Sequence, residues 1–334
     1  MSGKMPIRRE GVSGLVPLPG WDPANDWQGF HTPEKLPRVL NPPEGFIATA
    51  NQDLNYLGQA HPINVCMAGY RADQINAVLA ATDRGAPTKD VRAPAGIRTL
   101  EEMRRLQHDL YSLQAERFME LIRPILAEFT SAHAESVKLL LDWDFSYRSD
   151  SKAAFLFEEF YRALICEVFG KCQGAFGDTV LERILNETCL FFDFYGNFDR
   201  VLFAETSAWF GGRSRGELYR AALAVAVATP PEAYGPTRRV RMRHLLFGGK
   251  TPLWFGFDRM LELPGNRATV HQGQIYRGAG REMSFAPSFQ MVTDLGQDEI
   301  QTALPGGVSD RRFSKWYANG LSDWVKGHYK ILRP

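Results

Sequence analysis

The chain has 334 residues and a formal net charge of +1, from 39 lysines and arginines against 38 acidic residues, and 44% of its residues are hydrophobic. The near balance of charge argues against a protein built mainly to coat nucleic acid or an anionic membrane, and the apolar fraction is too high for a disordered chain. Its apolar runs, such as Ala221 to Ala228, are far shorter than the roughly 20 residues that a membrane-spanning helix needs.

Residues 1–45 are rich in proline, glycine and tryptophan. Proline at this density excludes regular helix and central strand, because it fixes φ and removes a backbone donor. We therefore expect an extended segment that lies on a surface and is held there by Trp21, Trp27 and Phe30.

Residues 45–51 alternate in a way that predicts a short strand, with Phe46, Ala48 and Ala50 on one face. The apolar pattern stops at Asn51, where a cluster of polar residues begins. Polar groups at a strand end are typical of a site, and they are also typical of an ordinary turn.

The middle of the chain is predicted to be helical. Thr99 and Glu102 have the spacing of a capping box, and apolar residues then recur at helical spacing as far as Ile125, which predicts one helix kinked by Pro124. Further helices are predicted over residues 134–142, 151–169, 178–193 and 214–228.

The last hundred residues change in character. Strands are predicted at residues 269–276 and 288–294, a turn at 304–307, and a closing amphipathic helix from Phe313 to Trp324. Strands followed by helices and then by strands indicate an α+β fold.

Four groups of residues allow a functional and a structural interpretation. Asp142 and Asp144 are paired carboxylates of the kind a glycosidase uses, but they are interpreted as a helix-terminal turn in preference to a glycosidase site. The four cysteines form no Cys-x-x-Cys pair and are interpreted as free thiols, and the seven histidines show no i, i+4 pairing, so no metal site is predicted. The arginines and the histidine of one basic cluster are interpreted as a strand face or as partners in ion pairs rather than as a nucleic-acid site: Arg238, Arg239, Arg241, Arg243 and His244.

Several separated segments, taken in order, resemble the penicillin acylase (penicillin amidase) family of N-terminal-nucleophile (Ntn) hydrolases. The segments that carry this resemblance span nearly the whole chain: 3–8, 19–27, 40–51 (Leu-Asn-Pro-Pro-Glu-Gly-Phe-Ile-Ala-Thr-Ala-Asn), 70–75, 106–112, 141–144, 287–294, 304–309 and 324–327.

The resemblance implies a partial αββα sandwich with a large helical insertion, and the hydrolysis of an acyl–amine amide bond, with β-lactam side chains and acyl-homoserine lactones among the family's substrates. It implies that Asn51 is the oxyanion-hole residue and that Arg71 orients it. The family's nucleophile is a residue exposed as a new chain N-terminus by autocatalytic cleavage, and its α-amino group serves as the base.

The chain departs from the family because it starts at a segment that follows the family's nucleophile. We therefore expect the C-terminal portion of a β subunit, partnered by an upstream segment or subunit of the same amidase, with a small N-acyl substrate and no nucleic acid or membrane. The rival interpretations are that Ser2 is the nucleophile, or that the chain is an inactive remnant acting as a binding protein.

Three divisions of one domain are expected: residues 1–98 with the site-bearing strand, the helical region 99–230, and the closing strands and C-terminal helix of 231–334. No cofactor is expected, since the calcium ligands of some relatives are mostly absent and residues 61–62 stand where one of them would lie. As encoded, without a signal peptide, the chain is expected to be cytoplasmic, and periplasmic or secreted if an upstream part supplies a signal.

Overall fold

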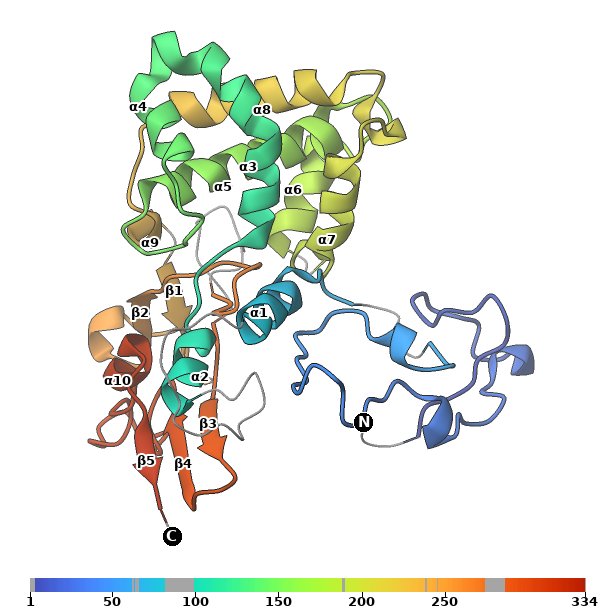
Figure 1. The fold of residues 1–334 in the computed structure, drawn as a ribbon, viewed down its shortest axis with the longest axis vertical. Helices are drawn as coiled ribbons and strands as arrows, with labels where there is room; N and C mark the ends of the chain where they lie inside the picture. The colour runs from blue at the N-terminus through green and yellow to red at the C-terminus, as the bar shows by residue number, and fades with distance from the viewer. Residues whose placement is uncertain are drawn as a thin grey trace.

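The computed structural model describes residues 4–61, 63, 66–81, 99–187, 190–237, 239–244, 246–273 and 286–333. Three parts are distinguished in Figure 1: an N-terminal arm of residues 4–61, a helical lobe formed by α3 to α8, and a β lobe that carries the five strands. Helix α1 (Tyr70–Ala80) lies where these parts meet.

The helical lobe is built around α5 (Lys152–Ile165), which packs against α8 (Arg215–Ala228). Both helices begin at serines whose hydroxyls accept backbone N–H bonds, Ser151 for α5 and Ser214 for α8, and Ser214 forms a full capping box. The core is aromatic, and removing one such ring typically costs about 3–5 kcal/mol. The other helices of this lobe are α3 (Leu113–Leu126), α4 (Thr130–Leu141), α6 (Asp178–Glu187) and α7 (Leu190–Phe203).

The helix predicted from Thr99 to Ile125 is wrong in one respect, because it is two helices, α2 (Leu100–Gln107) and α3. The capping box at Thr99 is confirmed. The break occurs because residues 110–112 bond across the chain to residues 145–147: the Ser112 N–H donates to the Phe145 carbonyl at 3.0 Å. The helix predicted over 178–193 is likewise described as α6 and α7, and residues 188–189 between them lie outside the described residues.

The β lobe contains two antiparallel sheets among the described residues. One pairs β1 (Arg239–Met242) with β2 (Arg259–Glu262), so that Arg239 faces Glu262. The other has the order β3–β4–β5, from β3 (Gln290–Asp294), β4 (Glu299–Ala303) and β5 (Lys330–Leu332). A small core of Val240, Leu263, Ala303 and Trp324 lies between the sheets and α10 (Leu321–Lys326), and the short helix α9 (Tyr234–Thr237) precedes β1.

Two further predictions for this lobe need correction. The closing helix does not span Phe313 to Trp324, because the segment before α10 bonds to a neighbouring turn: the Gly320 N–H donates to the Gly306 carbonyl at 2.8 Å. Residues 269–273 form a bend and irregular coil rather than a strand, and the remainder of that predicted strand lies outside the described residues, whereas the prediction at 288–294 is confirmed by β3.

Nearly all described residues of the arm are exposed or half-buried. Only Ala50 and Ala60 are buried among its described residues, while Trp21 is 88% exposed and Leu40 is 86% exposed. The arm's short 3₁₀ turns, Pro23–Asn25, Pro33–Lys35 and Asn55–Leu57, contain no buried residue.

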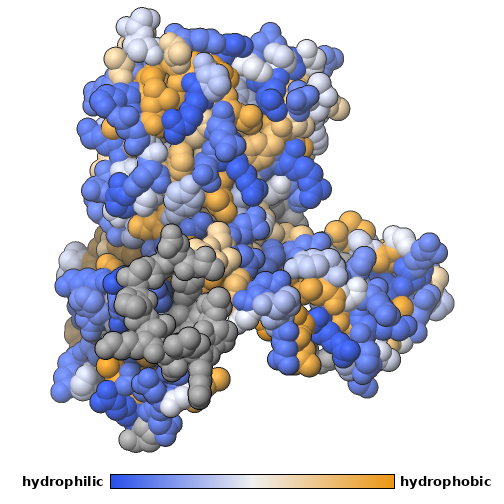
Figure 2. Space-filling model, in the orientation of Figure 1, coloured by the Kyte–Doolittle hydropathy of each residue, from blue (hydrophilic) through white to orange (hydrophobic). Residues whose placement is uncertain are grey.

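Two expectations for the arm are corrected. Trp21 does not hold the arm to a surface of this chain, and apolar side chains lie open on the face seen in Figure 2. The strand predicted at residues 45–51 is extended coil with a turn, because no neighbouring strand among the described residues supplies a hydrogen-bonded ladder.

Within the residues described, no helix is both long enough and apolar enough to span a bilayer.

The first testable prediction concerns His271, which is 5% exposed and stacks on His108 with ring centroids 5.1 Å apart. Burial, helped by His108, lowers the pKa of His271 to about 4. The unfolded chain then binds more protons between pH 6.5 and 4. His271 therefore lowers the free energy of unfolding by up to about 1.4 kcal/mol for each unit by which the pH is decreased in this range.

We expect His271→Gln to remove this slope in urea unfolding curves recorded at several pH values. His328→Gln, at an exposed position, serves as the control and keeps the slope. Equal slopes in His271→Gln and in the parent chain would contradict the assignment.

Candidate functional site

The candidate site is built on Arg71, in the first turn of α1. Its guanidinium is buried, 9% exposed, and its Nη2 donates to the Ala50 carbonyl and to Asn51 Oδ1, both at 2.8 Å. The same Nη2 contacts Met67 Sδ at 3.3 Å, and the Met67 N–H donates to the Asn51 carbonyl at 2.8 Å. These bonds join the arm to α1 and bring together the two residues that the sequence singled out.

The side chain of Asn51 has a defined orientation. A guanidinium only donates hydrogen bonds, so the carboxamide oxygen must face Arg71 and the Nδ2 group must point away from it. No hydrogen bond from Nδ2 to another described residue is formed, and Asn51 is exposed. Its φ of +66° lies in the left-handed region, which asparagine tolerates better than most residues. The structure thus presents a fixed N–H donor at the surface.

Arg71 also supplies positive charge that no carboxylate of the described residues neutralises. Among the described residues it forms no ion pair, its Nε has no hydrogen-bond partner, and burial lowers its pKa. A buried cation without a counter-ion is costly, and a nearby negative charge relieves that cost. The surroundings of Asn51 therefore favour an anion.

Helix α1 is held in place by a buried polar cluster centred on Asp199 of α7. Asp199 accepts hydrogen bonds from the Tyr70 hydroxyl at 2.9 Å, from Gln114 at 2.7 Å and from the Tyr161 hydroxyl at 2.6 Å. Burial raises the pKa of Asp199 to about 6, although its three donors act to lower it. Because Tyr70 is the residue before Arg71, this cluster fixes the position of the guanidinium.

A second bond and a close contact add to this anchoring. Gln74 of α1 donates to Asp109 at 3.0 Å. Gly196 of α7 allows the chain before α1 to approach, since a Cβ added there would lie 2.8 Å from the Ala68 Cβ. The motif at residues 106–112, noted in the sequence, thus supports the helix that carries Arg71.

A hollow of about 480 Å³ lies beside the site. Its lining includes Gln52, which follows Asn51 in the chain, and Met67, whose N–H bonds to the Asn51 carbonyl. Arg117 and Arg200 also line it, whereas Asn51 itself does not line the hollow. A hollow of this size accommodates a small organic molecule.

The other residues highlighted by the sequence have structural partners. Asp142 forms an ion pair with Lys138, and Asp144 pairs with Arg148 at 2.6 Å, so both carboxylates are engaged at the end of α4. In the basic cluster, Arg239 pairs with Glu262 at 3.4 Å and Arg241 with Asp258 at 3.0 Å, which confirms the ion-pair interpretation for these two residues.

Three cysteines, Cys66, Cys166 and Cys172, are free. Ser2, Cys189 and Arg238 lie outside the described residues. Within the described ranges, no cluster of three or more His, Cys, Asp and Glu side chains that could hold a metal ion is found.

The sequence reasoning did not find Asp199, Gln114 or Tyr70. Their partners lie 85 and 129 residues apart along the chain, so no local spacing could have revealed the cluster. The only available signal was an aspartate within an otherwise apolar helix face.

Comparison with known proteins places these observations in a family. The model of the family described as penicillin amidase matches residues 1–333. The chain is 23% identical over 354 residues to the acyl-homoserine lactone acylase QuiP of Pseudomonas fluorescens (strain Pf-5), covering 99% of this chain and 42% of that protein.

Two further relatives agree with this match. The penicillin acylase 2 proenzyme of Pseudomonas sp. (strain SE83) is 23% identical over 327 residues, which cover 93% of this chain and 39% of the relative. The thermostable penicillin G acylase from Alcaligenes faecalis superposes with a TM-score of 0.56 at 15% identity, covering 98% of this chain and 61% of that chain, which shows a shared mixed helix-and-sheet fold. This chain therefore spans about two fifths of the length of these curated relatives.

The second prediction tests the bond between Arg71 and the arm. We expect Arg71→Met to leave the Ala50 carbonyl and Asn51 Oδ1 without their donor, so that the Met67 amide exchanges its hydrogen at least tenfold faster while amides of α5 are unchanged. Hydrogen–deuterium exchange with peptide-level mass spectrometry measures both.

Arg117→Met is the matched control, because Arg117 lines the same hollow and its ion pair with Asp73 is exposed. Unaltered exchange at Met67 in Arg71→Met would show that the arm is held by other contacts.

Proposed function

This chain belongs to the penicillin amidase family, and we propose that it is the part of an amidohydrolase that holds the oxyanion donor, Asn51, and the residue that positions it, Arg71. The observation that carries the proposal is the pair of bonds from the Arg71 Nη2, which fixes the Asn51 oxygen and leaves Nδ2 as an outward donor beside a buried cation. The reaction is the hydrolysis of an acyl–amine amide to a carboxylic acid and an amine.

The proposed chemistry follows from the charge that develops on the substrate. A hydroxyl nucleophile adds to the amide carbon, the C=O electrons move to oxygen, and the resulting oxyanion accepts a hydrogen bond from Asn51 Nδ2. The C–N bond then breaks, the amine leaves with a proton, and water hydrolyses the acyl ester. Arg71 acts through Asn51 as a positioning residue and adds positive potential to the site.

We propose that the nucleophile and its base lie on an upstream segment or subunit. This division is supported by the share of the relatives that the chain spans and by the proenzyme character that the name of one relative records. The same segment would complete the αββα sandwich by pairing with the extended stretch at residues 45–51, which has no ladder of its own among the described residues. The helical region 99–230 would then be an insertion between residues 1–98 and 231–334 of one domain.

The substrate class is a small N-acyl compound. Relatives are named for acyl-homoserine lactones and for penicillins, both of which carry an amide between an acyl group and an amine. The hollow beside Asn51 is large enough for one end of such a molecule. The alternative function is that of an inactive remnant which keeps the arm as an interaction surface.

The third prediction tests Asn51 in the chain combined with an upstream segment that carries the nucleophile. Asn51→Gly removes the carboxamide and keeps the φ of +66°, which alanine would strain. We expect kcat for amide hydrolysis to fall roughly 10²- to 10³-fold, with little change in KM. Initial rates with an N-acyl chromogenic amide give both constants.

Two companion variants sharpen this test. Asn51→Asp keeps an oxygen for Arg71 and replaces the donor by an acceptor, so kcat should fall at least as far. Asn41→Gly, at the arm's other exposed left-handed asparagine with φ of +49°, should retain full activity. Equal activity of Asn51→Gly and Asn41→Gly would rule out the oxyanion role.

The fourth prediction concerns the exposed side chains of the arm. If the arm docks on the upstream segment, Trp21→Ala should weaken association about tenfold or more, since exposed aromatic anchors carry much of such binding energy. Trp254→Ala, at an 80% exposed position in the β lobe, should leave association unchanged. Titration of the labelled segment by fluorescence anisotropy provides both affinities.

Association of the segment without any amidase activity, together with unaltered binding by Asn51→Gly, would favour the inactive interaction protein.

A further inference from the structure

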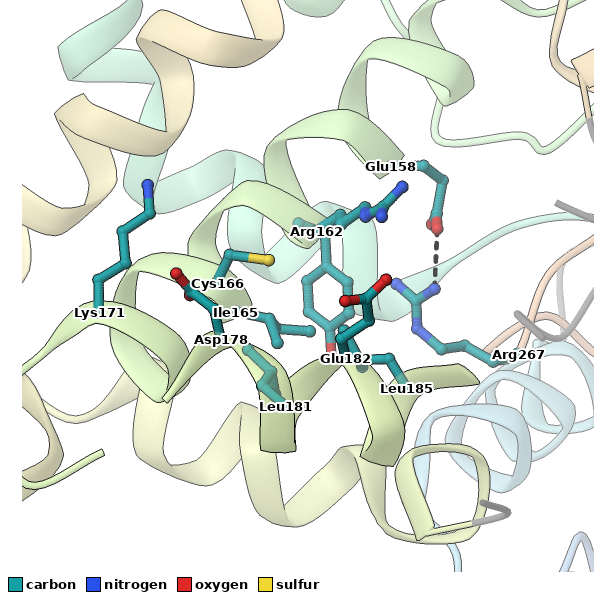
Figure 3. A pocket seen from close by; sticks show the side chains of 11 residues that line it. Glu158, Arg162, Ile165, Cys166, Lys171, Asp178, Leu181, Glu182, Leu185 and Arg267 are labelled. Carbon is teal, nitrogen blue, oxygen red and sulfur yellow. Dashed lines mark hydrogen bonds and ion pairs between the residues drawn. The ribbon is translucent and has the colours of Figure 1, made fainter. Parts of the chain in front are cut away.

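A second pocket lies within the helical lobe, on different elements from Asn51. It has a volume of about 300 Å³ and is formed by α5, by the π-helical turn Cys166–Lys171 that continues it, by α6, and by Arg267 from the loop before the third strand (Figure 3). π-Helical turns are rare and occur frequently at functional sites. None of its lining residues belongs to the machinery described above except Tyr161, which also bonds to Asp199.

Arg267 is the principal group of this pocket. Its side chain is 5% exposed, its Nη1 donates to Glu158 Oε2 at 2.9 Å, and its guanidinium lies over the Tyr161 ring at 4.1 Å from the centroid. Its Nε and Nη2 are buried and have no hydrogen-bond partner among the described residues. These two N–H groups lie on one edge of the planar guanidinium and point in parallel, an arrangement that matches the two oxygens of a carboxylate.

The Glu158 carboxylate does not accept from the Nε or Nη2 of Arg267, because its two oxygens accept from other donors. Its Oε1 accepts from the Tyr147 hydroxyl at 2.8 Å and its Oε2 takes the Nη1 bond. Two buried donors with no partner are unusual in a folded protein, and an occupant that accepts both bonds would remove the cost of leaving them unpaired.

The remaining walls define the rest of the occupant. Ile165, Leu181 and Leu185 form an apolar strip between Arg267 at one end and Lys171 at the other (Figure 3). Asp178 and Glu182 of α6 lie at the exposed rim, and no ion pair joins either to Arg267. Arg267 offers one edge for a carboxylate and the apolar strip forms the wall beside it, so the pocket suits one carboxylate on a short apolar body.

We propose that this pocket binds a small monocarboxylate, with its two oxygens on the Nε and Nη2 of Arg267 and its aliphatic or aromatic body against Ile165, Leu181 and Leu185. The site is distinct from the proposed amidase centre and needs no residue from another segment. A carboxylic acid is bound here as a ligand and undergoes no reaction.

The test is isothermal titration calorimetry on the full chain. The ligand is hexanoate, and its neutral isostere hexanamide is the comparison ligand. Hexanoate should bind at least tenfold more tightly than hexanamide. Arg267→Lys keeps the charge beside Glu158 and loses the parallel edge, so the hexanoate affinity should fall at least tenfold. Arg220→Lys, whose partner Glu128 is exposed on the surface, is the matched control and should bind hexanoate as the parent chain does.

A second variant protects the test against misfolding of Arg267→Lys. Leu185→Phe fills the half-buried end of the apolar strip without touching a buried charge, and it should abolish hexanoate binding while the far-ultraviolet circular dichroism stays unchanged. Equal affinity for hexanoate and hexanamide, or unchanged hexanoate binding in both pocket variants, would overturn the proposal. Asn51→Gly should bind hexanoate normally, so a failure here is separable from a failure of the amidase assignment.

Discussion

The buried guanidinium of Arg71 is the interaction on which the candidate site depends. The arm places only two alanines in the interior, so it has little hydrophobic attachment of its own among the described residues. Arg71 compensates with two short bonds to neighbouring groups of the arm, one to the main chain and one to the carboxamide of Asn51. The same two bonds attach the arm and orient the donor, so the geometry of the site and the position of the arm cannot be changed independently.

Arg71 has no counter-ion among the described residues, and its position is fixed by a rigid surrounding instead. Asp199 collects donors from α1, α3 and α5, and so it joins three helices around the first turn of α1. Both oxygens of the Asp199 carboxylate accept hydrogen bonds, and this specifies one arrangement of those helices, whereas apolar contacts alone tolerate sliding. Helix α1 therefore presents Arg71 from a fixed position, which is the condition for a preorganised donor at Asn51.

The sequence predicted those features that depend on neighbouring residues. The capping box at Thr99, the helices α4, α5, α6 and α8 and the strand β3 follow from local spacing, and the pairing of Asn51 with Arg71 followed from the family resemblance. It failed where a distant segment competes for the backbone: residues 110–112 leave the predicted helix to bond with 145–147, and Gly320 bonds to Gly306. The Asp199 cluster and the pair Glu158–Arg267 join residues up to 129 positions apart, and a single sequence holds no record of such contacts.

The stretch at residues 45–51 shows how local and distant constraints combine at the proposed site. Its alternation is that of a strand, yet a strand needs a ladder partner. In the described residues its one main-chain bond to a distant segment is the Met67 bond at its end. The left-handed backbone at Asn51 ends the extended stretch and turns the carboxamide toward Arg71. The orientation of the carboxamide is thus set by contacts within this chain, while the extended stretch that precedes it has no ladder partner among the described residues. In the proposed enzyme, an upstream strand bearing the nucleophile would pair with this unpaired edge and bring the attacking group to a carboxamide that is already in place.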